Sequence, residues 1–325
     1  MFYRPTSFWT WALVVLTVAE TLVVLAIEGI IFAMFRDAQR PISKTTSESK
    51  AVPMFLSLLI LGLLYQQLLV YDTLAHRNTI QLIGLCIYAA CFCVYTGLQV
   101  TQLQVAIVAL ADLDFLLIND IWAKIGPLAI VNATATGAHM LVLSGISFKL
   151  YAEFQWTIYR QLNADLDMQK RYFLFQIYMT LLKFDFFFFV GFLLQNAVVV
   201  AGFTGTVEWS VVVAVVYTVI VLITSSWYVK RENRLATAIL LGLQLVLLGY
   251  FIFRFTNMFS GNSYYLPVIK SLTYFAVITI LLGAITVGVG ITCMLNFNKG
   301  LKPHVSSNRL AEEWLGDHEM ELSEI

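Results

Sequence analysis

Long runs of apolar residues, separated by short polar segments, are the dominant pattern along this chain. A helix needs about 20 apolar residues to cross the roughly 30 Å hydrocarbon core of a bilayer, and eight runs reach that length. They are residues 8–35, 52–72, 79–108, 127–150, 172–200, 209–229, 235–255 and 268–297. The pattern predicts an all-α polytopic transmembrane helix bundle. The third run turns polar beyond Gly97, so seven spans are the alternative to eight.

The composition of the 325-residue chain agrees with this pattern, because 59% of the residues are hydrophobic and only 12% are charged. Soluble domains carry about 25% charged residues, so the lipid bilayer is the expected environment and partner. Twenty Lys and Arg residues balance twenty Asp and Glu residues. The net charge of zero argues against a nucleic-acid-binding protein, which depends on a positive field.

Positive charges in the loops predict the orientation, since cytosolic loops carry an excess of Lys and Arg. With eight spans both termini share one side, which holds eleven Lys and Arg residues against seven on the other side. We therefore expect both termini in the cytosol. The first loop holds four of those seven and argues for the reverse, and the loss of one span would give a receptor-like seven-span topology.

The two ends of the chain differ in character. The first apolar run is about twice the length of a signal-peptide core, so we expect it to remain as a membrane anchor. After the bundle, which we assign to residues 1–297, residues 298–325 form a polar and acidic cytosolic tail. Disorder is the simpler interpretation of this tail. A short amphipathic helix that docks a cytosolic protein partner is the alternative.

Motifs of known enzyme and metal sites are missing from the sequence. It contains no P-loop, no G-x-S-x-G elbow and no H-E-x-x-H pair. The four cysteines (Cys86, Cys91, Cys93 and Cys293) lie in apolar runs without His at metal-ligand spacing, which favours packing over a disulfide or zinc site. We expect no enzymatic activity, no metal and no cofactor.

Four charged residues stand well inside predicted spans, where each costs about 2.5–3.5 kcal/mol at the bilayer centre unless it faces the bundle interior. They are Glu20 and Glu28 in the first span and Lys183 and Asp185 in the fifth. Helical spacing places the first two on one face of their span, together with Thr17, Thr21 and Val24. We therefore expect this face to look into the bundle.

Helical rise places four ionisable groups from three spans at a common depth. Glu20, His139, Lys183 and Asp185 all fall about 17–20 Å from the cytosolic ends of their spans, which predicts an intramembrane polar cluster. Lys183 and Asp185 point about 200° apart on their helix, so each needs a partner elsewhere. We expect Lys183 to pair with Glu20 and Asp185 with His139, while Gln176 and Thr180 extend the polar face around Lys183.

Two interpretations of this polar cluster remain open. Buried ion pairs can fix which helices pack together, and the four consecutive Phe residues at 186–189 favour this structural role because bulky rings fill space. Intramembrane carboxylates beside a His can instead pass protons or ions. The second interpretation predicts a transporter or channel.

Two stretches of the sequence resemble a known family. They are Ala164-Asp-Leu-Asp-Met-Gln-Lys-Arg-Tyr172, which leads into Leu181-Leu-Lys-Phe-Asp-Phe-Phe-Phe-Phe189, and Tyr65-Gln-Gln-Leu-Leu-Val-Tyr-Asp-Thr-Leu74. Both are similar to blocks of a fungal family of Golgi apparatus membrane proteins of unassigned activity. The resemblance implies a multi-pass protein of the Golgi or a related endomembrane and supplies no catalytic or binding residues. We expect a structural or trafficking protein, with an ion- or proton-coupled transporter and a seven-span receptor as alternatives.

Overall fold

The structure of the chain is a computed structural model that describes residue 5 and residues 7–39, 47–117, 120–161, 166–204, 209–259 and 269–297. Within these ranges the regular structure is helical, apart from an isolated bridge between Gln39 and Leu116. The helices are α1 (Phe8–Ala38), α2 (Ser47–Ala75), α3 (Thr79–Asp112), α4 (Trp122–Gln161), α5 (Leu166–Thr204), α6 (Trp209–Lys230), α7 (Arg234–Met258) and α8 (Ile269–Leu295). All eight are long and apolar enough to cross a membrane, which confirms the predicted bundle with eight spans. The acidic tail lies outside the described residues.

The polar half of the third span is part of one continuous helix. α3 runs without a break from Thr79 to Asp112. Gln99 and Gln102, which lie one turn apart, are buried, whereas Thr101 on the exposed side donates its hydroxyl to the carbonyl of Leu98. Gln99 and Gln102 therefore face the bundle interior, whereas Gln104 is exposed.

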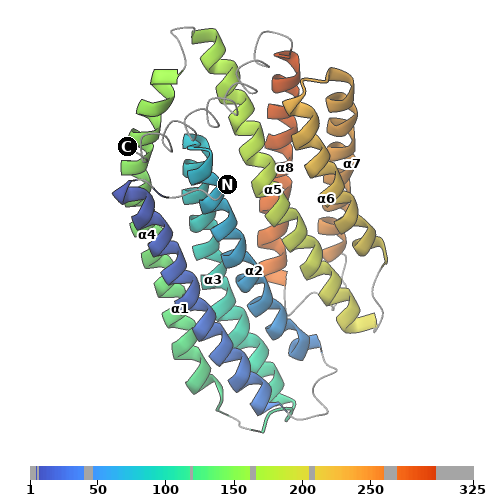
Figure 1. Cartoon of the computed structure of the whole chain (residues 1–325). Helices are drawn as coiled ribbons and strands as arrows, with labels where there is room; N and C mark the ends of the chain where they lie inside the picture. Colours follow the sequence, from blue (N-terminus) through green and yellow to red (C-terminus); the bar gives the residue numbers. More distant parts are fainter. Residues whose placement is uncertain are drawn as a thin grey trace, which may run out of the picture.

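The helices form two groups of four. α1 to α4 pack in a ring, each helix against the next and α4 against α1, and α5 to α8 form a second ring in the same way. α2 and α3 of the first group pack against α5, and α3 also packs against α8. Figure 1 shows the two groups side by side, α1–α4 in blue to green and α5–α8 in lime to red.

Aromatic rings fill the interface between the two groups. Tyr88 of α3 lies with its ring centroid 5.2 Å from that of Phe187 and 6.1 Å from those of Phe184 and Phe188, all on α5. Phe275 of α8 completes the layer, 5.8 Å from Phe188. The space-filling role expected for the Phe run is confirmed.

The two groups use the same turn between their second and third helices. Arg77 and Glu232 adopt left-handed backbone conformations, with φ of 45° and 52°. In each turn the following Asn donates its N–H to the carbonyl five residues back and its side chain accepts a backbone N–H of the next helix. This is the Schellman pattern joined directly to an N-cap, and it fixes where α3 and α7 begin.

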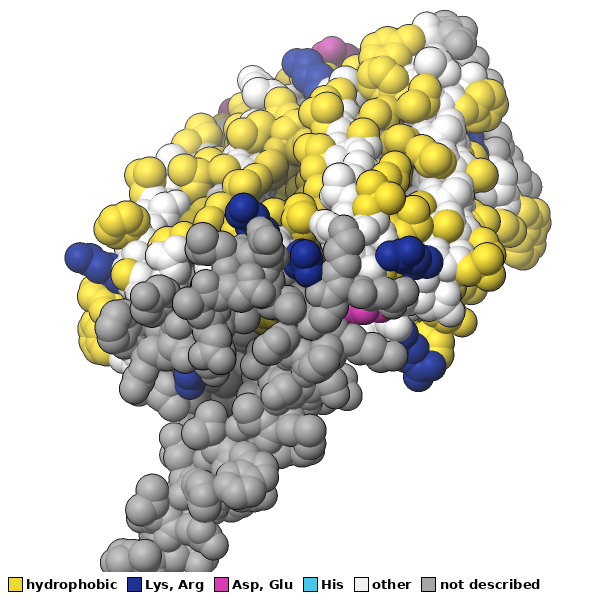
Figure 2. Space-filling model, turned by 90° about the horizontal axis from the view of Figure 1, so that it is seen from above, with side chains coloured by type: hydrophobic (Ala, Val, Ile, Leu, Met, Phe, Trp, Pro, Cys, Tyr) yellow, Lys and Arg dark blue, Asp and Glu magenta, His cyan; other side chains and the backbone are white. Residues whose placement is uncertain are grey.

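The two ends of the bundle differ in charge. We call the end where α1, α3, α5 and α7 begin the near end and the opposite one the far end. Figure 2 looks onto the near end and shows Lys and Arg side chains around it, with hydrophobic side chains along the flanks. Six basic residues lie here at helix ends and turns: Arg77, Lys170, Arg171, Lys230, Arg231 and Arg234.

Candidate functional site

Lys183 belongs to a closed polar trio at the near end. Its ammonium donates to Oδ2 of Asp72 on α2 and to Oε1 of Gln81 on α3, the latter over 2.9 Å. Gln81 in turn donates to the same Asp72 oxygen over 2.6 Å. None of the three side chains leaves a buried polar atom without a partner. We call Asp72, Gln81 and Lys183 the basic trio.

The expected pairing of Lys183 with Glu20 is therefore wrong. Asp72 lies three residues before the end of α2, so Lys183 sits beside the turn that joins α2 to α3. Glu20 contacts Gln66, which lies nine residues, or about 14 Å, before that end. Glu20 lies on α1, whose main partners are α2 and α4, whereas Lys183 lies on α5, which packs on α2, α3, α6 and α8.

The polar residues expected around Lys183 extend the trio toward the same turn. Thr180, one turn before Lys183, accepts a hydrogen bond of 3.5 Å from Nδ2 of Asn78, and Gln176 is buried on the same helix. His76 lies in the turn outside the membrane-spanning segments, with Nδ1 3.3 Å from Asp72. Its hydrogen bond to the Asp72 carboxylate raises the pKa of His76 above its usual range.

Glu20 and His139 form a buried contact between α1 and α4. Nδ1 of His139 lies 2.9 Å from Oε2 of Glu20, and both side chains are at least 96% buried. Gln66 of α2 donates to the same carboxylate oxygen over 2.9 Å. The neighbouring Gln67 donates to the carbonyl of Thr17, one turn before Glu20, and to the hydroxyl of Thr21, the residue after it. The polar face predicted for α1 is confirmed.

The expected pairing of Asp185 with His139 is also wrong. Asp185 is 1% exposed and lies on α5, whose partners are α2, α3, α6 and α8, whereas His139 lies on α4, which packs on α1 and α3. The nearest polar group acting on the Asp185 carboxyl is the hydroxyl of Thr286 on α8. Neither carboxylate oxygen has a partner at normal hydrogen-bond geometry among the described residues.

Glu28 lies two turns beyond Glu20 and is held by two amides. Nε2 of Gln99 on α3 donates to its Oε1 over 3.2 Å, and Nδ2 of Asn132 on α4 donates to the same oxygen over 2.5 Å. Thr136, buried one turn along α4 from both Asn132 and His139, lies between this level and the Glu20 level. We call Glu20, Gln66, His139, Thr136, Glu28, Gln99 and Asn132 the polar column.

Many buried atoms of the polar column have no hydrogen-bond partner in the structure. At the Glu20 level these are Oε1 of Glu20, Nε2 of His139 and Oε1 of Gln66. At the Glu28 level they are Oε2 of Glu28, Oε1 of Gln99 and Oδ1 of Asn132. Buried polar groups are normally satisfied, and each unsatisfied one costs about 1–3 kcal/mol. The polar column therefore contains buried polar atoms without a hydrogen-bond partner, whereas the basic trio contains none.

An apolar cluster separates the polar column from the far end. It is built from the last turns of α1 and α3, the first turns of α2 and α4 and Leu116. Its buried members are Ile31, Phe35, Ala38, Val52, Leu56, Leu103, Ala106, Ile107, Leu110, Leu116, Ile121, Ile125 and Ala129. We call it the far-end cluster.

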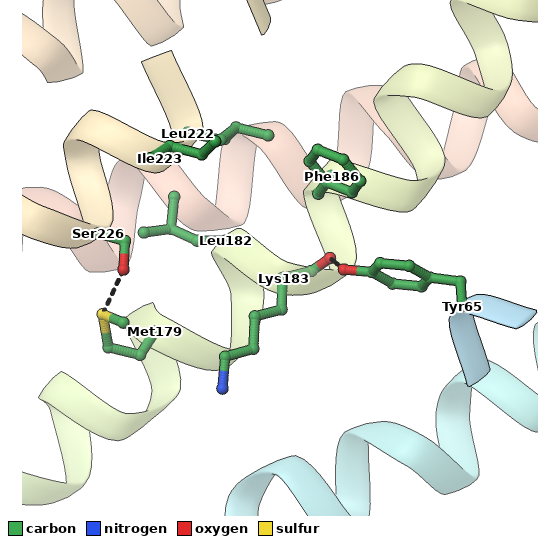
Figure 3. Close-up of a pocket in the computed structure, with 8 residues that line it drawn as sticks. All are labelled: Tyr65, Met179, Leu182, Lys183, Phe186, Leu222, Ile223 and Ser226. Atoms are coloured by element: carbon green, nitrogen blue, oxygen red, sulfur yellow. Dashed lines mark hydrogen bonds between the residues drawn. The ribbon is translucent and has the colours of Figure 1, made fainter. Parts of the chain in front are cut away.

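A cleft of about 230 Å³ opens between α2, α5 and α6 and was not anticipated from the sequence. Figure 3 shows Leu182 and Phe186 of α5 facing Leu222 and Ile223 of α6, with the Lys183 ammonium pointing away from them. Its walls are apolar except for Lys183, Ser226 and Tyr65, whose hydroxyl donates to the Lys183 carbonyl. Because Lys183 is already held by the basic trio, the cleft offers no free charge to a ligand.

Among the described residues no group of three His, Cys, Asp or Glu side chains gathers in a way that could hold a transition metal. All four cysteines are described and are free.

Comparison with known proteins gives one relative over nearly the whole chain. A UPF0658 Golgi apparatus membrane protein of Schizosaccharomyces pombe is 27% identical over an alignment of 311 residues that covers 88% of this chain and 87% of the relative. This chain is a homologue of that fungal protein. The predicted resemblance to a fungal family of Golgi membrane proteins is confirmed, and with eight membrane-spanning helices the chain is a multi-pass membrane protein. No family model matches the chain, and no solved structure matches it.

Proposed function

We propose that this protein moves protons or a small cation across a membrane of the Golgi type, through the group formed by α1 to α4. The observation that carries the proposal is the polar column, in which two carboxylates and a His lie buried in membrane-spanning helices with unpartnered polar atoms. Ionisable groups inside a membrane are expensive and typically mark ion or proton pathways. No covalent chemistry is required, and we propose that the protein is not an enzyme.

A contrast within the bundle supports a transport role over a purely structural one. A polar network that only holds helices together stabilises best when all its atoms are satisfied. The basic trio meets that condition and links α2, α3 and α5. The polar column does not, so its residues are better suited to exchange partners with a passing proton or ion.

Apolar side chains close both ends of the polar column, including Leu13, Leu143 and Leu150 toward the near end, but the near-end side also carries buried hydroxyl groups. Toward the near end, Ser147 and Thr10 continue the line of buried hydroxyl groups on α4 and α1, and Ser7 donates to Glu153 at the surface over 2.9 Å. Toward the far end the far-end cluster closes the same four helices with apolar side chains. Transport would then require the helix ends around Ile31 and Leu110 to separate, because ions do not cross a packed apolar layer.

The distribution of basic residues and the comparison with the fungal relative support an orientation of the chain in the membrane and a location in the cell. We propose that both termini face the cytosol, since the near end, where α1 begins and α8 ends, carries the larger set of basic residues. The name of the relative supports a Golgi location. We propose that the acidic tail after α8 is available to a cytosolic protein partner. Protease protection of tags at both ends, in sealed Golgi vesicles, tests the orientation.

Flux through reconstituted protein tests the proposal directly. Liposomes loaded with a pH-sensitive dye should acidify faster with the protein than without it when a proton gradient is imposed. Glu20→Gln and His139→Gln should each reduce that rate at least tenfold. Asp185→Asn is the matched control, because it neutralises a buried carboxylate of the other helix group and should leave the rate unchanged.

A second measurement covers transport of a cation other than the proton. If proton flux is absent, uptake of radioactive sodium or potassium by the same liposomes should replace it and show the same dependence on the polar column. Folded protein without either flux would overturn the proposal and favour the structural or trafficking role.

A further inference from the structure

We propose that Glu28, Gln99 and Asn132 form a binding site for a monovalent metal cation of the sodium type, with Gln102 contributing from the next turn of α3. The inference deepens the proposed function, because it names the ion that the polar column would bind. It stands on a different observation, namely the orientation of the amide groups around Glu28.

The hydrogen bonds fix that orientation. Both amide nitrogens, Nε2 of Gln99 and Nδ2 of Asn132, point at Oε1 of Glu28. The two amide oxygens and the second carboxylate oxygen are consequently left over, and all three are buried without a partner. Gln102 is 3% exposed, and neither its oxygen nor its nitrogen has a partner. The helices α1, α3 and α4 thus each supply carboxylate or amide oxygen atoms near Glu28.

The donor set selects the class of ligand. Carboxylate and amide oxygens are hard ligands that suit the hard cations of groups one and two. Zinc and copper favour thiolate and imidazole ligands. Among the described residues no group of three or more His, Cys, Asp or Glu side chains gathers at the Glu28 level. A proton on Oε2 would also neutralise the carboxyl, but it could satisfy only one of the leftover amide oxygens, whereas a metal cation is coordinated by several oxygens at once.

Charge balance decides whether the bound cation is monovalent or divalent. Glu28 is 1% exposed, and its hydrogen-bonding partners are neutral amides. Along α1 its nearest ionisable neighbours are Glu20 and Arg36, each eight residues or about 12 Å away. The Glu20 carboxylate contacts His139 instead. A monovalent cation would bring the Glu28 level to zero net charge, whereas a divalent one would leave a buried positive charge, which is costly in a membrane.

The position of the site near the middle of the membrane suits an ion whose binding is coupled to transport. Glu28 and Asn132 each lie ten residues, about 15 Å, from the far-end limits of α1 and α4, so the site is near the middle of the membrane. The far-end cluster begins one turn away, at Ile31 and Ala129. A cation bound here would hold α1, α3 and α4 together, directly beneath the apolar layer that closes the far end.

Thermal unfolding of the purified full chain in lipid nanodiscs tests the binding without any transport. We expect the midpoint to rise with the logarithm of sodium chloride concentration, by on the order of 5 °C over a hundredfold range, relative to choline chloride at equal ionic strength. Glu28→Gln should abolish the rise, because the amide removes the charge while keeping the shape. Asp185→Asn, the matched loss of a buried carboxylate on α5, should keep it.

Equilibrium binding of radioactive sodium gives a second readout that does not depend on stability. We expect one ion per chain in the parent protein and a loss of affinity of at least tenfold in Gln99→Met, which keeps Glu28 in place. A parent protein without sodium-dependent stabilisation and without stoichiometric binding would overturn the inference. Binding without flux would uphold this site and overturn the proposed transport, and flux without binding would do the reverse.

Discussion

His139 on α4 meets Glu20 on α1 across 2.9 Å in the buried interior of the first helix group. The two side chains also share Gln66 of α2 as a neighbour, because its amide donates to the same carboxylate oxygen. One contact thus joins three helices at a single depth. The ring of α1, α2, α3 and α4 closes where α4 returns to α1, and this contact lies at that closure.

A double-mutant cycle on Glu20 and His139 should show strong coupling. Glu20→Leu leaves the imidazole buried without its partner, and His139→Leu leaves the carboxylate, so each change should cost about 3–5 kcal/mol. The double variant should cost clearly less than the sum, because it strands neither group. Reversible unfolding in mixed detergent micelles measures the three values. Additive costs would show that the two side chains do not interact.

The basic trio should behave as a separate unit. Lys183→Met removes the cation beside the Asp72 carboxylate, and we expect a loss of about 1–3 kcal/mol that the added change Asp72→Leu partly restores. The loss is smaller than for a fully buried pair, because the two side chains are 29% and 30% exposed and Asp72 keeps its hydrogen bond from Gln81. Lys183→Met combined with Glu20→Leu should instead give additive costs, since the two residues share no hydrogen-bond partner. The same unfolding assay compares both pairs. Coupling between Lys183 and Glu20 would restore the pairing expected from the sequence.

How far the sequence predicts this structure depends on whether a property belongs to one helix or to several. The buried face of α1 follows from the spacing of Thr17, Glu20 and Glu28 alone, and the eight spans follow from length and hydropathy. Pairing depends on which faces of which helices meet, and no single span reveals this. Glu20 of α1 and Lys183 of α5 both face α2, where they contact Gln66 and Asp72, two polar residues that lie six positions apart.

The partners that sequence analysis missed are mostly uncharged. Gln66, Gln99 and Asn132 carry no formal charge, so a search for buried ions passes over them, and Gln99 was interpreted as a weakness of the third span. Asp72 was placed at a span end, although α2 continues to Ala75. The signal was present in the form of polar residues inside apolar runs, and amides there merit the same scrutiny as carboxylates.

Close packing of α2 and α3 against neighbouring aromatic rings predicts that glycines differ in how well they tolerate substitution by alanine. A Cβ added at Gly84 of α3 would lie 2.4 Å from Cε2 of Phe184, and one added at Gly62 of α2 would lie 2.3 Å from Cε2 of Phe92. We expect Gly84→Ala and Gly62→Ala to cost about 1–3 kcal/mol through overpacking. Gly97→Ala is the control, because no atom lies within 4 Å of its Cβ, and it should be neutral or stabilising by up to about 1 kcal/mol. Equal effects at all three positions would contradict the packing of α2 and α3.

The turn between α2 and α3 should make stability depend on pH through His76. The hydrogen bond to Asp72 raises the pKa of His76, so the protonated imidazole is favoured in the folded state. Its contribution is complete below the unfolded-state pKa, about 6.5, and is lost as the pH rises through the higher folded-state value. The side chain is 65% exposed, so the effect will be small and weakened by salt.

Measurement of His76 by nuclear magnetic resonance, with the histidine ring labelled, gives the sign directly. The parent protein should titrate above the ordinary range for histidine, and Asp72→Asn should return the pKa toward about 6.5. His76→Gln should remove the corresponding part of the stability difference between pH 6 and pH 8. A parent titration at or below 6.5 would show that the Asp72 carboxylate is fully committed to Lys183 and Gln81, because the imidazole would then gain nothing from being charged.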